Sequence, residues 1–326
     1  MNKIIYYIDV LLAHNVSEEF TYKHETIEKP RVGMIVLAPL RSGEKIGVIT
    51  KVNSVLNDSK IKLKFIKEIS PEYRLNSKMI KFLNWVSNYN LIDRGLVLKM
   101  ILSHSKFYFK KKKTKELTSN IKKNVKAIKL SLEQKRASQD ILKIFQQRNF
   151  KPVLLDGVPG SGKTEVYFDV IKKFIKDGEQ VLIMFPEVSL TGDFVNRIEE
   201  RFGFSPVVWH SKISTAYKTK VLKSIIDGTS QIIIGARSSL FLPYKNLSMI
   251  VLDEEHDSSY KQEEQGIYHA RDMSVVKSSI EDIPIILTSA TPSLETIFNV
   301  MNKKYNKVSI KNLSLIHISE PTRRPI

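Results

Sequence analysis

Two kinds of hydrophobic pattern follow one another along the chain. In the first hundred residues, short runs of apolar and β-branched residues are separated by turn-forming residues, of which 41–44 (Arg-Ser-Gly-Glu) is the clearest group. This pattern is typical of β-strands joined by turns. The strands that it predicts are residues 4–12, 31–39, 45–52 and 62–69.

A helical pattern follows the predicted strands. Between residues 77 and 89, five apolar residues share one helix face; they are Met79, Phe82, Leu83, Val86 and Tyr89. Residues 96–102 form a second, shorter candidate helix. Residues 103–130 contain a run of lysines at 110–113. Because like charges repel one another, we expect a flexible basic linker there, either passive or in contact with phosphates.

From residue 132 onward, short apolar runs alternate with segments of helical periodicity. The expected strands are 152–155, 181–185, 207–209, 231–234, 249–252 and 284–287, with helices that include 163–176 and 217–227. Such alternation is typical of a parallel α/β sheet. We therefore predict an α/β protein, with a β-rich domain and its helices at 1–102 and one lobe at 131–312 whose sheet carries helices on both faces.

The composition narrows the class of protein. The 326 residues are 42% hydrophobic, so a core can form, and 52 Lys+Arg against 34 Asp+Glu give a net charge of +18. A surplus of this size favours nucleic acid or an anionic membrane surface as partner, although a lysine-rich proteome would give it as well. The chain has no cysteine, which excludes disulfides and cysteine-bound zinc in this sequence. No apolar run approaches the ~20 residues of a membrane span, so we expect a cytoplasmic protein.

A glycine-rich loop supplies the first candidate site. Residues 157–164 fit the pattern G-x-x-x-x-G-K-[ST], directly after an apolar strand and before a helix. Backbone N–H groups of such a loop and the helix N-terminus bind phosphates. Lys163 is expected to reach the β- and γ-phosphates, and Thr164 to hold Mg²⁺. The nucleotide-binding residues expected from this loop are Gly157, Gly160, Ser161, Gly162, Lys163 and Thr164.

Two further strand ends carry polar side chains. The strand at 249–252 is followed by Asp253 and Glu254, at the edge where ligands bind in such sheets. Asp253 would complete the Mg²⁺ shell, and Glu254 would orient and deprotonate an attacking water. The strand at 284–287 is followed by hydroxyl residues that include Ser289 and Thr291. These could sense a γ-phosphate, or they could simply cap the next helix.

These elements in this order, G-x-G-K-T, D-E-x-H and S-A-T, resemble a superfamily 2 helicase. A wider set of motifs resembles the family of primosomal replication-restart helicases (primosomal protein N′, PriA) over nearly the whole chain to about residue 312. The matching segments are residues 20–22, 33–39, 132–134, 185–191, 210–211, 235–241 and 253–272, together with the helix around Trp85.

The resemblance implies an ATP-dependent 3′→5′ DNA helicase that restarts replication at stalled forks. Its lobe would be a RecA-like P-loop NTPase fold that uses ATP and Mg²⁺, and residues 1–102 would bind the 3′ end of a nascent strand. Partners implied are forked and single-stranded DNA, primosome proteins and single-strand-binding proteins. The resemblance also assigns residues: Gln134 to adenine; Thr191 and Arg237 to the single strand; Tyr260, Lys261, Tyr268 and Arg271 to a loop that couples DNA binding to hydrolysis; Phe20 and Lys64 to the 3′-end pocket.

The sequence departs from the family in several places. Thr21 stands where the family has an acidic residue, Arg41 where it has glycine, and Ile267 where it has arginine. The linker at 103–130 is too short for the winged-helix domain that the family usually inserts. The departures at Thr21 and Arg41 make recognition of a 3′ end less firmly predicted than the fold.

The chain also stops soon after the third motif, without a second lobe or the zinc-binding cysteines that the family carries there. Residues 313–323 are similar to the translation of a transposase-type sequencing adapter, so we expect a non-native tail at 313–326 and a truncated N-terminal fragment with little or no turnover. Zn²⁺ is expected only in the missing half. Alternatives are a non-catalytic DNA-binding module with a P-loop scaffold and, more remotely, a P-loop kinase or transport ATPase.

Overall fold

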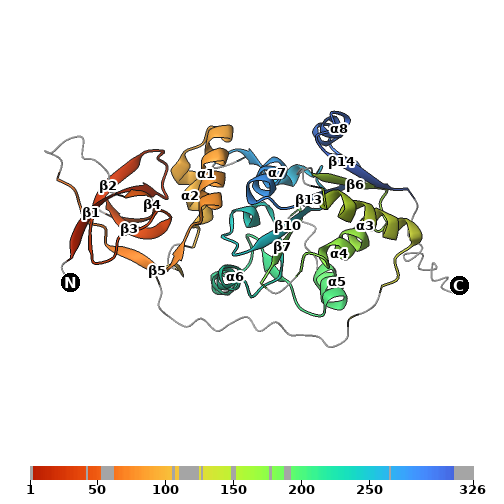
Figure 1. Ribbon diagram of the computed structural model, residues 1–326, viewed down its shortest axis with the longest axis horizontal. Coiled ribbons are helices and arrows are strands. Elements are labelled where there is room, and N and C mark those ends of the chain that lie inside the picture. Colours follow the sequence, from red (N-terminus) through yellow and green to blue (C-terminus); the bar gives the residue numbers. More distant parts are fainter. Residues whose placement is uncertain are drawn as a thin grey trace, which may run out of the picture.

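A computed structural model of the chain describes residues 3–41, 43–52, 62–104, 107–109, 125, 128–147, 152–175, 178–186, 192–263 and 266–311. A small sheet and a large α/β lobe lie at opposite ends of the molecule, with helices α1 and α2 between them (Figure 1). The predicted tail at 313–326 and most of the predicted linker lie outside these residues. No helix in the described ranges is long and apolar enough to cross a membrane.

The N-terminal part is an antiparallel sheet of five strands in the order β2-β1-β4-β3-β5. Its strands are β1 (Ile4–Leu12), β2 (Glu19–Thr26), β3 (Met34–Leu40), β4 (Gly43–Val52) and β5 (Glu68–Arg74). The β-rich prediction is confirmed. The strand predicted at 62–69 was wrong, because the strand begins only at Glu68, and β2 was missed because its alternating charges hide the apolar side.

Helices α1 (Ser77–Asn90) and α2 (Arg94–Ile101) follow the sheet. The side chain of Asn76 caps α1 by accepting a hydrogen bond of 2.7 Å from the Met79 amide. Gly95 places α2 against the end of β1, because a Cβ at this position would lie 2.0 Å from the carbonyl oxygen of His14. Only glycine permits this close approach.

The lobe contains a seven-stranded sheet in the order β14-β6-β13-β10-β7-β9-β8, and its recorded pairings are parallel. Its strands are β6 (Val153–Gly157), β7 (Gln180–Met184), β8 (Val207–Trp209), β9 (Ile232–Gly235), β10 (Leu247–Leu252), β13 (Ile285–Ser289) and β14 (Asn306–Ile310). The parallel α/β prediction is confirmed, and β14 is an additional edge strand that the sequence analysis missed.

Helices cover both faces of this sheet. Helices α3 (Leu132–Phe145), α4 (Lys163–Ile171) and α5 (Gly192–Phe202) pack on one face. The other face carries α6 (Thr215–Asp227), the 3₁₀ helix η3 (Arg237–Phe241) and α7 (Ala270–Glu281). Helix α8 (Leu294–Met301) leads into β14. Successive residues of each central strand therefore belong to different cores, as expected of a sheet buried on both sides.

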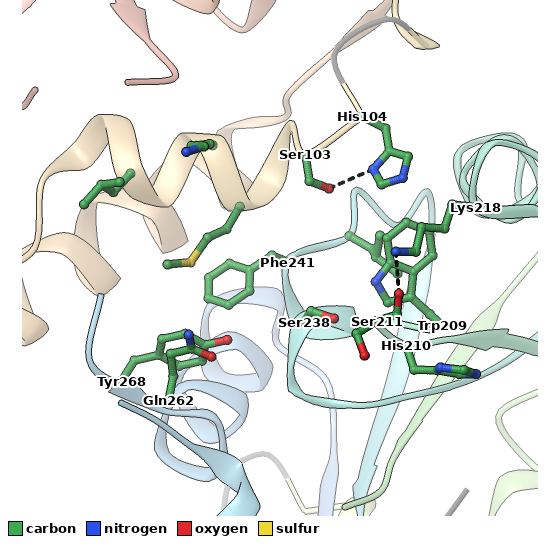
Figure 2. A pocket seen from close by; sticks show the side chains of 14 residues that line it. Ser103, His104, Trp209, His210, Ser211, Lys218, Ser238, Phe241, Gln262 and Tyr268 are labelled. Carbon is green, nitrogen blue, oxygen red and sulfur yellow. Dashed lines mark hydrogen bonds between the residues drawn. The ribbon is translucent and has the colours of Figure 1, made fainter. Parts of the chain in front are cut away.

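The N-terminal helices and the lobe meet in a continuous contact. A cavity of about 380 Å³ lies within it, lined by α2 on one side and by the ends of lobe elements on the other (Figure 2). Beside the cavity, Phe82 of α1 packs against Phe241 of η3 with ring centroids 5.7 Å apart.

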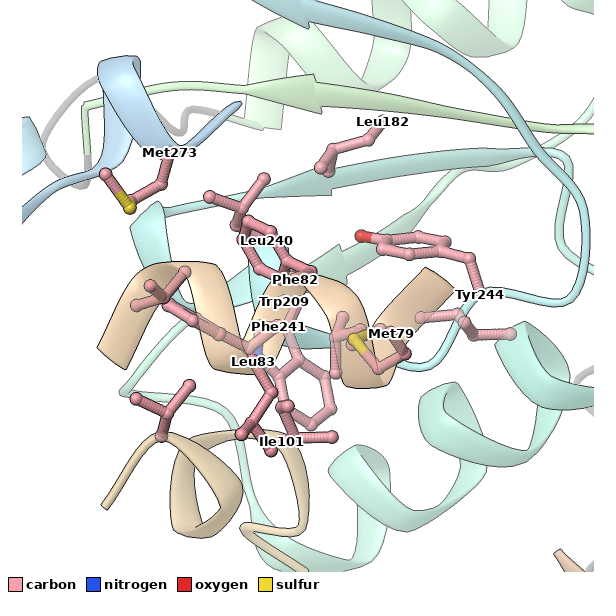
Figure 3. Packing of buried hydrophobic residues seen from close by; sticks show 14 of the residues in the cluster. Met79, Phe82, Leu83, Ile101, Leu182, Trp209, Leu240, Phe241, Tyr244 and Met273 are labelled. Atoms are coloured by element: carbon pink, nitrogen blue, oxygen red, sulfur yellow. The ribbon is translucent and has the colours of Figure 1, made fainter. Parts of the chain in front are cut away.

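The hydrophobic core itself crosses this contact. Met79 and Leu83 of α1 belong to the same buried cluster as Trp209 and Tyr244 of the lobe (Figure 3). Within the stretch predicted as a linker, Tyr108 is also buried in this cluster, and its carbonyl accepts a hydrogen bond from Ser70. The sheet-bearing N-terminal part and the lobe are thus joined by packing as well as by the chain.

Candidate nucleotide and DNA site

The glycine-rich loop lies between β6 and α4, as its pattern predicts. Gly160 and Gly162 have positive φ angles of 77° and 84°, a conformation that favours glycine. A Cβ on Gly157 would lie 2.7 Å from the hydroxyl oxygen of Ser161. That hydroxyl is buried and has no hydrogen-bond partner among the described residues. A buried unpaired hydroxyl in a tight loop of backbone amides fits a phosphate-binding cradle.

The side chains of Lys163 and Gln134 donate hydrogen bonds to backbone carbonyls of this loop. The Lys163 ammonium donates a hydrogen bond of 2.7 Å to the carbonyl of Gly157 and is largely buried. The amide of Gln134 donates to the carbonyl of Ser161 at 3.0 Å, while its oxygen accepts from the Ser131 amide at 2.9 Å. The sequence analysis assigned Gln134 to adenine. Here its side chain also fixes α3 to the phosphate loop, and the adenine contact stays a prediction.

Asp253 follows β10 and lies beside the loop. One carboxylate oxygen accepts a hydrogen bond of 3.0 Å from the Tyr167 hydroxyl, and the other accepts from Thr288. Burial raises the pKa of Asp253, although these hydrogen bonds and the charge of Lys163 oppose the rise. A single carboxylate with the Thr164 hydroxyl is the donor set that Mg²⁺ uses when phosphates and water supply the remaining ligands.

Glu254 has a positive φ of 47°, which is unusual for a residue with a side chain. Burial raises the pKa of Glu254, and the charge of Asp253 raises it further. Its carboxylate lies 3.6 Å from Nδ1 of His256, which in turn lies 2.8 Å from the hydroxyl of Ser289. The Ser289 hydroxyl also accepts from the amide of Thr291 at 3.0 Å. His256 therefore links the Glu254 carboxylate to Ser289 of the third motif.

The expected coupling loop contains the 3₁₀ helix η4 (Ser258–Tyr260) and a small hairpin of β11 (Lys261–Gln262) and β12 (Tyr268–His269). Tyr260 is 1% exposed, and its hydroxyl donates a hydrogen bond of 2.7 Å to the carbonyl of Asp253. Its ring therefore presents no face for base stacking. Tyr268 is also buried, with its ring against Phe241, whereas Lys261 is exposed.

Arg237 holds this loop against η3. Its guanidinium donates to the carbonyls of Ser259 and Lys261 at 3.0 and 2.7 Å. The side chain is half-buried, so it joins the predicted DNA-contacting segment to the loop that borders the carboxylates. Thr191 lies outside the described residues.

Arg271 lies in an internal network, and its partner Glu255 was not predicted. Glu255 is fully buried. Its carboxylate accepts hydrogen bonds from the Ser293 amide at 2.7 Å, from Thr296 at 2.9 Å and from Arg271 at 3.4 Å. Arg271 also donates to the Ser293 hydroxyl at 2.6 Å. The sequence Asp-Glu-Glu-His at 253–256 could have pointed to Glu255, because the sequence analysis gave roles to Asp253 and Glu254 but none to Glu255.

The predicted 3′-end residues lie on the N-terminal sheet. Phe20 is half-buried in β2, and the exposed Lys64 donates to the carbonyl of Arg41 at 3.4 Å. Arg41 has a φ of 54°, the conformation that glycine adopts readily. Thr21, which stands where the family has an acidic residue, donates a hydrogen bond of 2.7 Å to the carboxylate of Asp9 on the neighbouring strand. A carboxylate therefore lies beside this position even though residue 21 itself is not acidic.

Both parts of the chain match known protein families. Residues 131–300 match the DEAD/DEAH box helicase family, and residues 9–103 match the 3′ DNA-binding domain (3′BD) of PriA. The replication restart protein PriA of Rickettsia felis is 37% identical over 299 residues, which are 89% of this chain and 45% of that protein. PriA of Haemophilus influenzae is 47% identical over 156 residues, which are 48% of this chain and 21% of that protein.

Among solved structures, RecG bound to a three-way DNA junction is similar over 76% of this chain and 30% of that chain, with 19% identity and a TM-score of 0.42. This likeness is too weak to carry an argument. The chain spans at most about half the length of these PriA proteins, with 45% of the Rickettsia felis protein covered.

Proposed function

Because the chain belongs to the DEAD/DEAH box helicase family, we propose that it is the amino-terminal part of an ATP-dependent 3′→5′ DNA helicase that restarts replication at stalled forks. Its similarity to PriA along 89% of its length supports this proposal. The observation that carries it is the position of the carboxylates beside the helix that the phosphate loop begins, where Tyr167 of α4 donates a hydrogen bond of 3.0 Å to Asp253. Burial raises the pKa of Asp253 and of Glu254, and the charge of Lys163 partly opposes both rises.

In the proposed mechanism, the loop amides and Lys163 bind the β- and γ-phosphates of ATP, and Thr164 and Asp253 hold Mg²⁺. When bound, Mg²⁺ would neutralise charge on the phosphates. Glu254, whose raised pKa makes it a better base than an exposed carboxylate, orients the attacking water and accepts its proton. An arginine from a second lobe completes such sites, so we propose that the fragment alone has little or no turnover.

Coupling to DNA is proposed to run through the loop that Arg237 holds. A strand lying on η3 would displace the backbone of Ser259 and Lys261, and Tyr260 connects this segment to the carbonyl of Asp253. The N-terminal sheet, with Phe20 and Lys64, would hold the 3′ end of a nascent strand. We also propose the cytoplasm as the location, primosome and single-strand-binding proteins as partners, and Zn²⁺ only in the missing part.

The test compares Lys163→Ala with the matched control Lys173→Ala, which removes a lysine exposed beyond the end of α4. In a version extended by a second lobe, Lys163→Ala is expected to abolish DNA-stimulated ATP hydrolysis and unwinding, with the affinity for forked DNA unchanged. Unwinding that survives Lys163→Ala would contradict a catalytic role for the P-loop and favour the alternative, a DNA-binding module in which the P-loop is only a scaffold. Robust DNA-stimulated hydrolysis by the 326-residue chain would contradict the proposed inactivity of the fragment.

A further inference from the structure

Tyr167 is a residue of α4 that takes no part itself in the proposed binding or hydrolysis of ATP. It is fully buried, and its hydroxyl donates a hydrogen bond of 3.0 Å to Oδ2 of Asp253. Tyr167 follows Thr164 by three positions in the helix, so the two side chains lie on the same helix face. A single hydroxyl therefore lies beside both residues that are proposed to hold Mg²⁺.

The surroundings of Tyr167 keep its hydroxyl a donor. Burial, and then the charge of Asp253, raise the pKa of Tyr167 well above its usual value, although a hydrogen bond with the Thr164 side chain opposes the rise. The hydroxyl is therefore protonated at neutral pH. Its partner, an ionised carboxylate, only accepts hydrogen bonds, so the proton lies between the Tyr167 and Asp253 oxygens.

The hydrogen bonds of Asp253 are divided unequally between its two carboxylate oxygens. Oδ1 accepts from the Thr288 side chain and from the Glu254 amide, the latter at 3.1 Å. Among the described residues, Oδ2 accepts from Tyr167. Since each oxygen of a carboxylate has about two lone-pair sites, Oδ2 is the oxygen that keeps one free for a cation. The Tyr167 hydroxyl holds this oxygen in place.

The ring of Tyr167 gives its hydroxyl a fixed position. It belongs to the buried core between α4 and the sheet, and it packs edge-on against Phe168 with ring centroids 5.2 Å apart. A side chain whose rotamer is locked by packing can hold a neighbouring ligand in one orientation. Tyr167 thus connects the helix that carries Thr164 to the strand end that carries Asp253.

We propose that Tyr167 is a positioning residue, which orients Asp253 and Thr164 for Mg²⁺ and thereby sets the affinity of the nucleotide site for the metal. This inference rests on the proposed function, which supplies the nucleotide and the metal. Groups that hydrogen-bond to metal ligands fix the orientation of those ligands, and losing one typically weakens metal binding by about 10- to 100-fold. The alternative is a structural role, in which the hydroxyl only satisfies a buried carboxylate.

The experiment uses Tyr167→Phe, which removes the hydroxyl and keeps the ring. Binding of mant-AMPPNP, a fluorescent ATP analogue that is not hydrolysed, is measured first in EDTA and then over a series of Mg²⁺ concentrations. In EDTA the affinity of Tyr167→Phe is expected to equal that of the unaltered chain. The Mg²⁺ concentration that gives half of the full gain in affinity is expected to rise about tenfold.

Two further variants calibrate this Mg²⁺ midpoint. Tyr244→Phe is the matched control, because Tyr244 is also buried and donates a hydrogen bond of 2.8 Å to the carbonyl of Ser239, outside the phosphate loop. It is expected to lower the free energy of unfolding in urea as Tyr167→Phe does, but to leave the Mg²⁺ midpoint unchanged. Thr164→Ala removes a proposed ligand and is expected to raise the midpoint at least as far as Tyr167→Phe.

The outcomes separate this inference from the proposed function. If Thr164→Ala raises the Mg²⁺ midpoint and Tyr167→Phe does not, the role of Tyr167 is structural and only the inference is overturned. The same holds if Tyr167→Phe weakens binding in EDTA and leaves the midpoint unchanged. If Mg²⁺ does not strengthen binding of mant-AMPPNP to the unaltered chain, or if no binding occurs, the proposed function fails together with the inference.

Discussion

Lys277 is a buried cation at the contact between α1 and the lobe. It is 1% exposed, its ammonium donates to the carbonyl of Leu240 at 2.7 Å, and it lies 5.0 Å from the ring centroid of Phe82 and 5.4 Å from that of Tyr244. Burial lowers its pKa from 10.5 to about 8, although the charge of Glu281 opposes the change. The aromatic faces and the carbonyl therefore only partly replace the lost water.

The lowered pKa predicts how stability depends on pH. Between about pH 8 and 10.5 the unfolded chain holds the Lys277 proton while the folded chain releases it, so this residue makes folding more favourable as pH rises. Relative to Lys277→Met, the free energy of unfolding should therefore increase by about 2 kcal/mol between pH 7 and 9.5. Urea unfolding of both proteins at the two pH values measures the difference. A constant difference would mean that the ammonium stays charged in the fold.

At the residue scale, sequence reasoning found the groups that chemistry requires but could not see which of them are buried. The loop from Gly157 to Thr164 was recognisable because its backbone conformation demands glycine at fixed spacing. Tyr260 and Arg271 were assigned by resemblance to a DNA-coupling loop, and only the fold shows that both side chains point inward. Burial of a polar side chain depends on long-range packing, which local sequence does not encode.

At the scale of elements, the buried pair Glu255–Arg271 joins the loop after β10 to the starts of α7 and α8. Removing Arg271 leaves the fully buried Glu255 without its counterion, which is costly. Removing Glu255 deprives Arg271 of its buried partner, although the ion pairs with Asp272 and Glu295 remain. We expect Glu255→Ala and Arg271→Ala each to lower the free energy of unfolding, and the double variant to lose less than the sum. The difference from additivity should be on the order of 1 kcal/mol or more.

Urea unfolding of the four proteins completes this thermodynamic cycle. The exposed pair Asp140–Lys143 on α3, with side chains 57% and 73% exposed, is the matched control. Such a surface pair should give a coupling of at most a few tenths of a kcal/mol. If the coupling free energies of the buried and exposed pairs were equal, the Glu255–Arg271 pair would not stabilise the contact of the loop after β10 with α7 and α8.

Strands and helices of the lobe followed from periodicity because each is buried on a regular face. The prediction of secondary structure was less successful for the strands at the edges of the two sheets. The edge strand β14 contains Lys307 and Ser309, whose side chains are exposed, and β2 is an edge strand with a similar mixture. One-sided burial and frequent charge leave little apolar signal, so these strands become evident only through their pairing with β6 and β1.

At the scale of the whole molecule, the net charge of +18 predicts salt-dependent DNA binding. If the chain covers about five phosphates of a single strand, the logarithm of the association constant should fall with the logarithm of salt concentration with a slope near −3.5. Anisotropy of a labelled oligo(dT) at several salt concentrations measures this slope. A flat response would show that the charge reflects lysine-rich composition alone.

The shared core predicts that the N-terminal helices and the lobe unfold together. Trp85 lies in α1 and Trp209 in β8, so Trp209→Phe and Trp85→Phe give one fluorescent probe in each part. Because Phe82 packs against Phe241 across the contact, Phe82→Ala should remove about 3 kcal/mol or more and move both transitions to the same lower urea concentration. Separate transitions, or a shift confined to the Trp85 probe, would mean that the two parts fold independently.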